Sequence, residues 1–168
     1  VIVFFVLSGF VIAYVSRCKE HSAKNYALSR AARIYSVALP AILLTIVLDL
    51  LRTTYVPTFH EYQFHKLWCY IPLWTAFGTD WWFLNENMLS NGPFWSLSYE
   101  VWYYVIFGSL FYFRGWKRYF FTMLALAVVG PRQWLLFPIW LSGCALYGLH
   151  ERHPLGRVLA RYIFFSSI

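Results

Sequence analysis

Charged side chains are scarce in this sequence. Asp, Glu, Lys and Arg together make up 12% of its 168 residues, whereas roughly 25% is usual for a soluble globular domain. Hydrophobic residues account for 60% and aromatic residues for 23% of the chain. This composition excludes an ordinary soluble domain and favours a protein whose surface faces lipid, with the bilayer as its first partner.

Cysteine is also sparse and carries no pairing pattern. Cys18, Cys69 and Cys144 are far apart, and no short interval or matching histidine spacing accompanies them, so neither a disulfide framework nor a zinc site is indicated. His60 and His65 are five residues apart rather than the four that would place both on one helix face, so we expect them to be surface-loop residues. The sequence therefore predicts no metal site.

Basic residues outnumber acidic ones by 14 to 7, yet they lie between hydrophobic runs rather than in one patch. Such spacing is typical of residues that orient helices toward anionic leaflets, so we predict no nucleic-acid partner.

The chain opens inside an apolar run, without the charged flank and cleavage site of a signal peptide, and closes in another apolar run. We expect residues 1–168 to be one transmembrane domain truncated at both ends.

Apolar runs predict the fold class, because a spanning helix needs about 20 residues. A shorter run, 67–79, contains Pro72 and is predicted to be re-entrant or interfacial. The expected fold is all-α, a polytopic transmembrane helical bundle with about five spanning helices, at 1–15, 34–51, 94–113, 119–130 and 134–149.

Charge bias between these runs predicts the topology. Segment 17–33 holds five basic residues and one acid, segment 114–118 holds three basic residues and no acid, and the stretch after Leu149 is also mainly basic. All three should be cytoplasmic by the positive-inside rule. The connection 80–93 carries Asp80 and Glu86 but no basic residue, so it should lie outside, and Asp49 should reach that outer interface. We therefore expect a multi-pass integral protein of the plasma or cytoplasmic membrane.

Glu100 is the first functional candidate because it lies inside the apolar run 94–113. A charge near the centre of a membrane helix costs about 2.5 to 3.5 kcal/mol, so such residues usually face a partner, a cavity or a substrate. Ser96 falls on the same helical face and can approach the carboxylate. Glu100 could hold or move a proton or orient a polar substrate, or it could form an interhelical bond that only fixes packing.

Two further pairs of residues are candidates. Arg30 and Arg33 are three residues apart, hence on one helical face, and their guanidinium groups suit phosphate or carboxylate oxygens. They could equally be topological anchors. Ser8 and Gly9 permit close helix approach, which by itself favours packing over chemistry.

Three motifs carry a common signal when they are taken together: FFVLSGF at 4–10, RAARIY at 30–35 and FWSLSYE at 94–100. In order and spacing they resemble the signature blocks of the acyltransferase-3 family, which are integral membrane O-acyltransferases acting on sugars and related acceptors. Segment 140–147, WLSGCALY, also looks like a later helix of that family. The resemblance covers nearly the whole chain, and its most specific part is the motif at 94–100.

The resemblance implies a coenzyme A thioester, typically acetyl-coenzyme A, as donor substrate on the cytoplasmic side, with no bound cofactor. It implies a hydroxyl of a carbohydrate or lipid-linked molecule as acceptor. A catalytic role is carried over to Glu100, and substrate-binding roles are carried over to Ser8, Gly9, Arg30 and Arg33. Ser96, on the same helical face as Glu100, is also expected to bind substrate.

The chain departs from the family pattern in two places. Ser36 stands where the family commonly has proline. The family's catalytic histidine lies on a helix that would precede Val1, so we expect residues 1–168 to be inactive by themselves. The alternative function is half of a transporter or channel with Glu100 as an ion or proton site, although the inverted internal repeat typical of transporters is not visible in the sequence.

Overall fold

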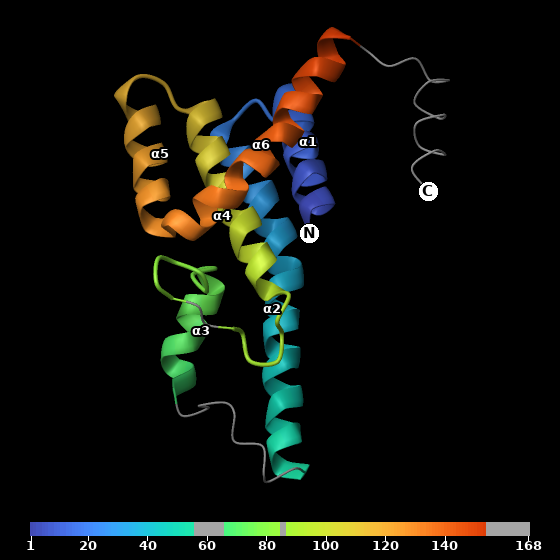
Figure 1. The fold of residues 1–168 in the computed structure, drawn as a ribbon, viewed down its shortest axis with the longest axis vertical. Coiled ribbons are helices and arrows are strands. Elements are labelled where there is room, and N and C mark those ends of the chain that lie inside the picture. The colour runs from blue at the N-terminus through green and yellow to red at the C-terminus, as the bar shows by residue number, and fades with distance from the viewer. Residues whose placement is uncertain (56–65, 85–86, 154–168) are drawn as a thin grey trace, which may run out of the picture. The chain divides into compact units, whose positions relative to one another are not determined.

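Helices are the sole regular elements in the part of the chain that the structure, a computed structural model, describes: residues 1–55, 66–84 and 87–153. The predicted all-α class is therefore confirmed for these residues. Figure 1 shows the helices in chain order: α1 (Ile2–Cys18), α2 (Ala23–Tyr55), α3 (Leu67–Thr75), α4 (Phe94–Tyr112), α5 (Trp116–Val129) and α6 (Pro131–Arg152).

Two compact units divide the chain. The first comprises 1–19 and 138–168, so it contains α1 and the larger part of α6. The second comprises 20–137 and contains α2, α3, α4, α5 and the first turns of α6. Each unit is described by itself below.

Helix α2 is much longer than the span predicted at 34–51. Its 33 residues correspond to about 50 Å at 1.5 Å per residue, against a hydrocarbon core of about 30 Å. The extra turns include residues 23–33, which precede the apolar run that defined the predicted span. Ala23, Ala27, Ala31 and Ala32 are strong helix formers, and they extend the helix beyond that run.

Helix α3 is short, as its proline and length indicated. Its nine residues reach only about 14 Å, which is far less than a bilayer core. The Tyr35 hydroxyl donates to the Thr75 carbonyl at 2.9 Å and so attaches the end of α3 to α2. The structure thus agrees with a segment that does not cross completely.

Helix α4 begins at Phe94 and ends at Tyr112, close to the predicted 94–113, and it packs against α2 and α5. Gly115 and Gly130 bound α5 with φ angles of 61° and 79°, a backbone region that side chains with a Cβ rarely adopt. Pro131 then opens α6, where its missing N–H costs nothing in the first turn.

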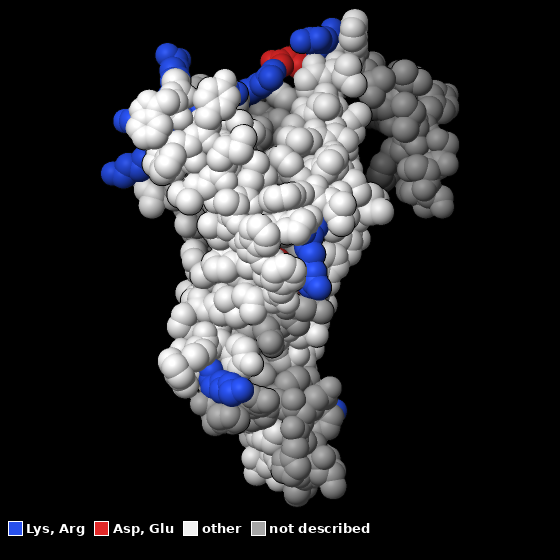
Figure 2. All heavy atoms as spheres, turned by 60° about the vertical axis from the view of Figure 1, so that its left-hand side comes forward, with Lys and Arg blue, Asp and Glu red and all other residues white. Residues whose placement is uncertain are grey.

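Helix α2 is the one helix within the described ranges that is both long and apolar enough to cross a membrane. Helix α1 is apolar but shorter, so the count of five crossings stays a prediction. Most of the face in Figure 2 carries neither basic nor acidic side chains, as expected of a surface in contact with lipid. Along α2, large apolar side chains are exposed at Val37, Leu39, Leu43, Leu44, Val47 and Leu48.

Contacts within each unit agree with the predicted topology. In the second unit the Tyr112 hydroxyl donates to the Glu20 carbonyl at 2.8 Å, which brings the end of α4 to the segment that precedes α2. In the first unit Arg17 and Glu151 form an ion pair, which joins the end of α1 to the end of α6. Segments predicted to be cytoplasmic are therefore neighbours within each unit.

Candidate functional site

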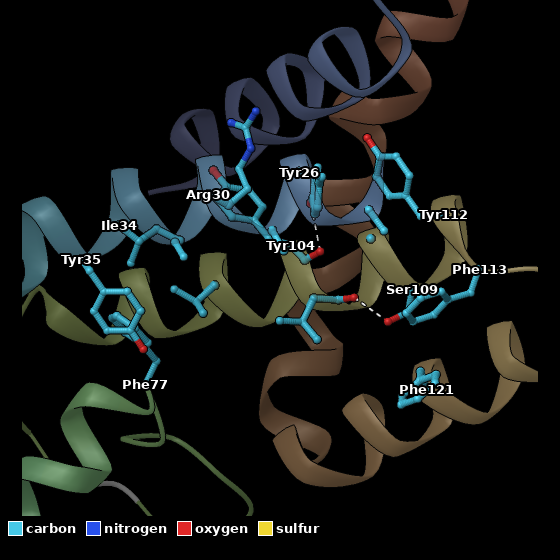
Figure 3. A pocket seen from close by; sticks show the side chains of 16 residues that line it. Tyr26, Arg30, Ile34, Tyr35, Phe77, Tyr104, Ser109, Tyr112, Phe113 and Phe121 are labelled. Atoms are coloured by element: carbon cyan, nitrogen blue, oxygen red, sulfur yellow. Dashed lines mark hydrogen bonds between the residues drawn. The ribbon is translucent and has the colours of Figure 1, made fainter. Parts of the chain in front are cut away.

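A cavity of about 380 Å³ lies in the second unit, mainly between α2 and α4. This volume falls in the range of about 300 to 1,000 Å³ that is usual for small-molecule sites. Figure 3 shows the sixteen side chains that line it. Ala23, Ala27 and Ala31 recur every fourth residue on one face of α2, and Gly108 lies on α4, so small residues leave the space open.

The cavity wall is apolar except for Arg30, one serine and four tyrosines. Each of those five hydroxyl groups donates its proton to another protein group: Tyr26 to Tyr104 O at 2.9 Å, Tyr35 to Thr75 O at 2.9 Å, Ser109 to Val105 O at 2.8 Å, Tyr112 to Glu20 O at 2.8 Å, and Tyr104 to the Glu100 carboxylate. Two of these bonds are drawn in Figure 3. The wall consequently offers no uncommitted hydroxyl donor.

Arg30 is the one cationic group of the lining. Its Nη2 lies 3.0 Å from Glu20 Oε1, and both side chains are largely buried. The guanidinium carbon lies 5.7 Å from the centroid of the Tyr26 ring, within the range of a cation–π contact. Its Nε–H has no hydrogen-bond acceptor among the described residues, although a buried N–H normally has one. Figure 3 shows the guanidinium at the edge of the cavity, pointing away from α4.

Arg33 has different surroundings from Arg30. Both are in α2, as the spacing required, but Arg30 is buried and Arg33 is exposed. The cavity lining includes Arg30 and not Arg33. The structure therefore brings only the first of the two predicted arginines to this site, and a role for Arg33 in binding stays a prediction.

Glu100 lies behind the cavity wall. It is 7% exposed and accepts a hydrogen bond from Tyr104, which is one helical turn further along α4 and itself lines the cavity. The predicted neighbour Ser96 donates instead to the Pro93 carbonyl at 2.9 Å. Ser98 is fully buried and donates to the Phe77 carbonyl, which fixes α4 against the turn after α3.

Ser8 and Gly9 form a helix contact inside the first unit. Trp140 Nε1 donates to Ser8 Oγ at 3.2 Å, and Cys144 Sγ donates to the Gly9 carbonyl at 3.2 Å. A Cβ built on Gly9 would overlap the Trp140 carbonyl, and one on Gly143 would overlap the carbonyl of Val6. These contacts agree with close packing of α1 and α6, and a role in lining a substrate site remains a prediction.

Asp49, which was expected to reach the outer interface, is buried under the connection before α4. It is 3% exposed, and its Oδ2 accepts the Ser90 backbone N–H at 3.0 Å. One turn earlier on α2, Thr45 Oγ1 lies 3.5 Å from Asn91 Nδ2. The loop before α4 therefore covers the carboxylate near the end of α2, and a position of Asp49 at the outer interface stays a prediction.

Asp80, in the acidic connection before α4, is buried as well. Burial raises the pKa of its carboxyl group above the usual range, and Arg132, whose Nη1 is 3.9 Å away, partly offsets this rise. The other candidates of the predicted outer segments, His60, His65 and Glu86, lie outside the described residues. In the described part of the chain, no three His, Cys, Asp or Glu residues are grouped so that they could hold a metal ion.

Two residues of the site were missed by sequence reasoning. Tyr104 follows Glu100 by four residues, a spacing that places both on one helical face and could have identified it. Glu20 is the sole acid in the basic segment 17–33, but nothing in the sequence pairs it with Arg30 ten residues later.

Comparison with known proteins gives one match. A family model described as an acyltransferase domain matches residues 1–165, which is nearly the whole chain. No curated protein and no solved structure matches the chain.

Proposed function

This chain belongs to the acyltransferase-3 family of membrane acyltransferases, and from that premise we propose the reaction it carries out. An acyl group, acetyl in the simplest case, passes from a coenzyme A thioester to a hydroxyl of a carbohydrate or lipid-linked acceptor. The acyl carbon–sulfur bond breaks, an ester carbon–oxygen bond forms, the acceptor hydroxyl loses its proton to a base, and coenzyme A leaves as the thiol.

The observation that carries this proposal is Arg30 at the edge of the apolar cavity. The guanidinium retains an uncommitted Nε–H beside its bond to Glu20, so it can donate to a carbonyl or phosphate oxygen of the donor. The basic character of 17–33 favours a cytoplasmic position for this edge, where coenzyme A thioesters occur.

Glu100 has a second role in the proposed reaction. Its bond from Tyr104 links the carboxylate to the cavity wall, so its charge can act on groups at that wall through a buried hydrogen bond. We assign Glu100 to positioning and electrostatic tuning of the transfer.

The proposed setting is the plasma or cytoplasmic membrane, crossed several times by the protein. A bilayer setting is supported by the apolar helix α2 and by the exposed apolar side chains along it. The donor would be met on the basic, cytoplasmic side. The proposed substrate contacts of Arg33, Ser8 and Gly9 rest on the resemblance, and that of Ser96 rests on its helical spacing from Glu100.

The test is transfer of a labelled acetyl group. Vesicles containing the full-length protein are incubated with acetyl-coenzyme A labelled in the acetyl group, and carbohydrate and lipid-linked fractions are examined for base-labile label. One coenzyme A thiol should be released for each ester formed. Membranes with the protein present but no labelled ester above that of membranes lacking it would contradict the proposal.

A further inference from the structure

The wall of the cavity between α2 and α4 suggests what part of the donor it holds. We infer that it accommodates the hydrocarbon chain of the acyl group, so that the protein accepts donors of about six carbons as well as acetyl-coenzyme A. The inference rests on the proposed function and extends it to the class of donor.

The chemistry of the wall favours a hydrocarbon occupant over a polar one. The five lining hydroxyl groups donate their protons within the protein, and the remaining lining side chains other than Arg30 are aliphatic, aromatic or glycine. A sugar or nucleotide placed here would leave most of its own hydroxyl or phosphate oxygens without donors, which is unfavourable in a buried site. A hydrocarbon chain has no polar atoms that need hydrogen-bond partners.

The position of Arg30 indicates how a bound molecule is oriented in the cavity. The cationic group stands at the edge of the cavity and points away from α4, while the interior is apolar. A molecule with a polar or anionic head and an apolar tail matches this arrangement if the head lies at Arg30 and the tail lies inside. A coenzyme A thioester has this form, because its acyl chain is joined to a pantetheine and phosphate portion.

The size of the cavity sets an upper limit on the length of the acyl chain. Its volume is about 380 Å³, whereas a methylene group takes roughly the space of one water molecule, about 30 Å³. An acetyl group would leave most of that space empty, and unfilled apolar space loses packing contacts. By the same estimate the cavity holds about a dozen methylene-sized groups, so a chain of about six carbons fits and occupies about half of the space.

Ala31 and Ala32 provide a matched pair of variants. Both are neighbouring alanines in α2, but Ala31 lines the cavity and Ala32 is exposed outside it. Ala31→Leu inserts a larger side chain into the space proposed for the acyl chain, whereas Ala32→Leu adds the same atoms to the outer surface. Leucine suits a helix nearly as well as alanine, so both variants should keep α2 intact.

The experiment compares acetyl-, hexanoyl- and octanoyl-coenzyme A as donors for the full-length protein in vesicles. In the native protein, hexanoyl transfer should proceed at least as efficiently as acetyl transfer. Ala31→Leu should lower kcat/KM for the hexanoyl and octanoyl donors about tenfold relative to acetyl, since methylene groups in an apolar pocket have effects of this size. Ala32→Leu should keep the native donor profile.

The other possible results would overturn either the acyl-chain assignment alone or the proposed function as well. Acetyl transfer without hexanoyl transfer, or an unchanged donor profile in Ala31→Leu, would overturn the acyl-chain assignment and leave the proposed function intact; the second result would point to a membrane lipid or another helix in the cavity. Absence of transfer from every donor would overturn the proposed function and this inference with it. If Ala31→Leu does not accumulate in membranes, Ala27→Leu, which fills the same α2 face, replaces it.

Discussion

Arg30 and Arg33 show how two identical residues of one motif can differ in their surroundings. Both lie in α2, but only Arg30 is buried, paired with Glu20 and part of the cavity wall. A guanidinium can hold Glu20 with one nitrogen and offer another N–H elsewhere, which the ammonium of lysine cannot do with the same geometry. The first residue should therefore be the more sensitive of the two.

The prediction is that Arg30→Lys lowers acyl transfer by about tenfold or more, the scale of a lost charge-assisted hydrogen bond. Arg33→Lys, which keeps the charge at an exposed position, should have a clearly smaller effect. Initial rates at equal amounts of membrane protein measure the difference. Equal losses in the two variants would mean that the cavity edge has no special role.

Asp80 gives a pH-dependent prediction. Burial raises the pKa of its carboxyl group in the folded protein, so the folded state binds the proton more tightly than the unfolded state. Its contribution to stability is therefore present at low pH and is lost as pH rises from the ordinary value of 3.8 through the raised value. Asp80→Asn should flatten this part of the stability profile, measured as the midpoint of detergent-induced unfolding between about pH 4 and pH 7. An unchanged slope would contradict the assignment.

At the scale of elements, the sequence predicted the presence of the helices well and the contacts between distant residues poorly. The extent of α4 follows from an apolar run that ends near Arg114, and the prediction was close. The start of α2 was missed because alanine-rich turns outside the membrane have no hydrophobic period to reveal them. The burial of Asp49 depends on a loop forty-one residues away, a contact that local patterns do not encode.

The crossing of α1 and α6 in the first unit permits an element-scale prediction. A side chain on Gly143 would overlap the Val6 carbonyl, whereas Gly148, five residues further along α6, has nothing near the position of a Cβ. Gly143→Val should destabilise the protein by about 1 to 3 kcal/mol or more through overpacking. Gly148→Val is the matched control, with the same helix propensity change and no collision. Detergent-induced unfolding distinguishes them, and equal midpoints would argue against the close crossing.

For the whole molecule, topology is the property that links the sequence to the bilayer. Segment 17–33, which includes the first turns of α2, carries basic charge, and the connection 80–93 carries acidic charge. A cysteine placed at Asn87 should react with an impermeant thiol reagent added outside intact cells, and one placed at Asn25 should not. These labelling experiments need a background without Cys18, Cys69 and Cys144. Equal labelling of both positions from one side would refute the predicted arrangement.

The central claim is that this membrane chain transfers acyl groups with the help of its buried carboxylate, and Glu100→Gln tests it most directly. Glutamine keeps the size of the side chain and its ability to accept a hydrogen bond from Tyr104, but it removes the charge. In vesicles containing the full-length protein, transfer from labelled acetyl-coenzyme A should fall by about 10² or more, while the amount of inserted protein stays the same. Native rates in the Glu100→Gln protein would contradict the claim and leave Glu100 with a packing role alone.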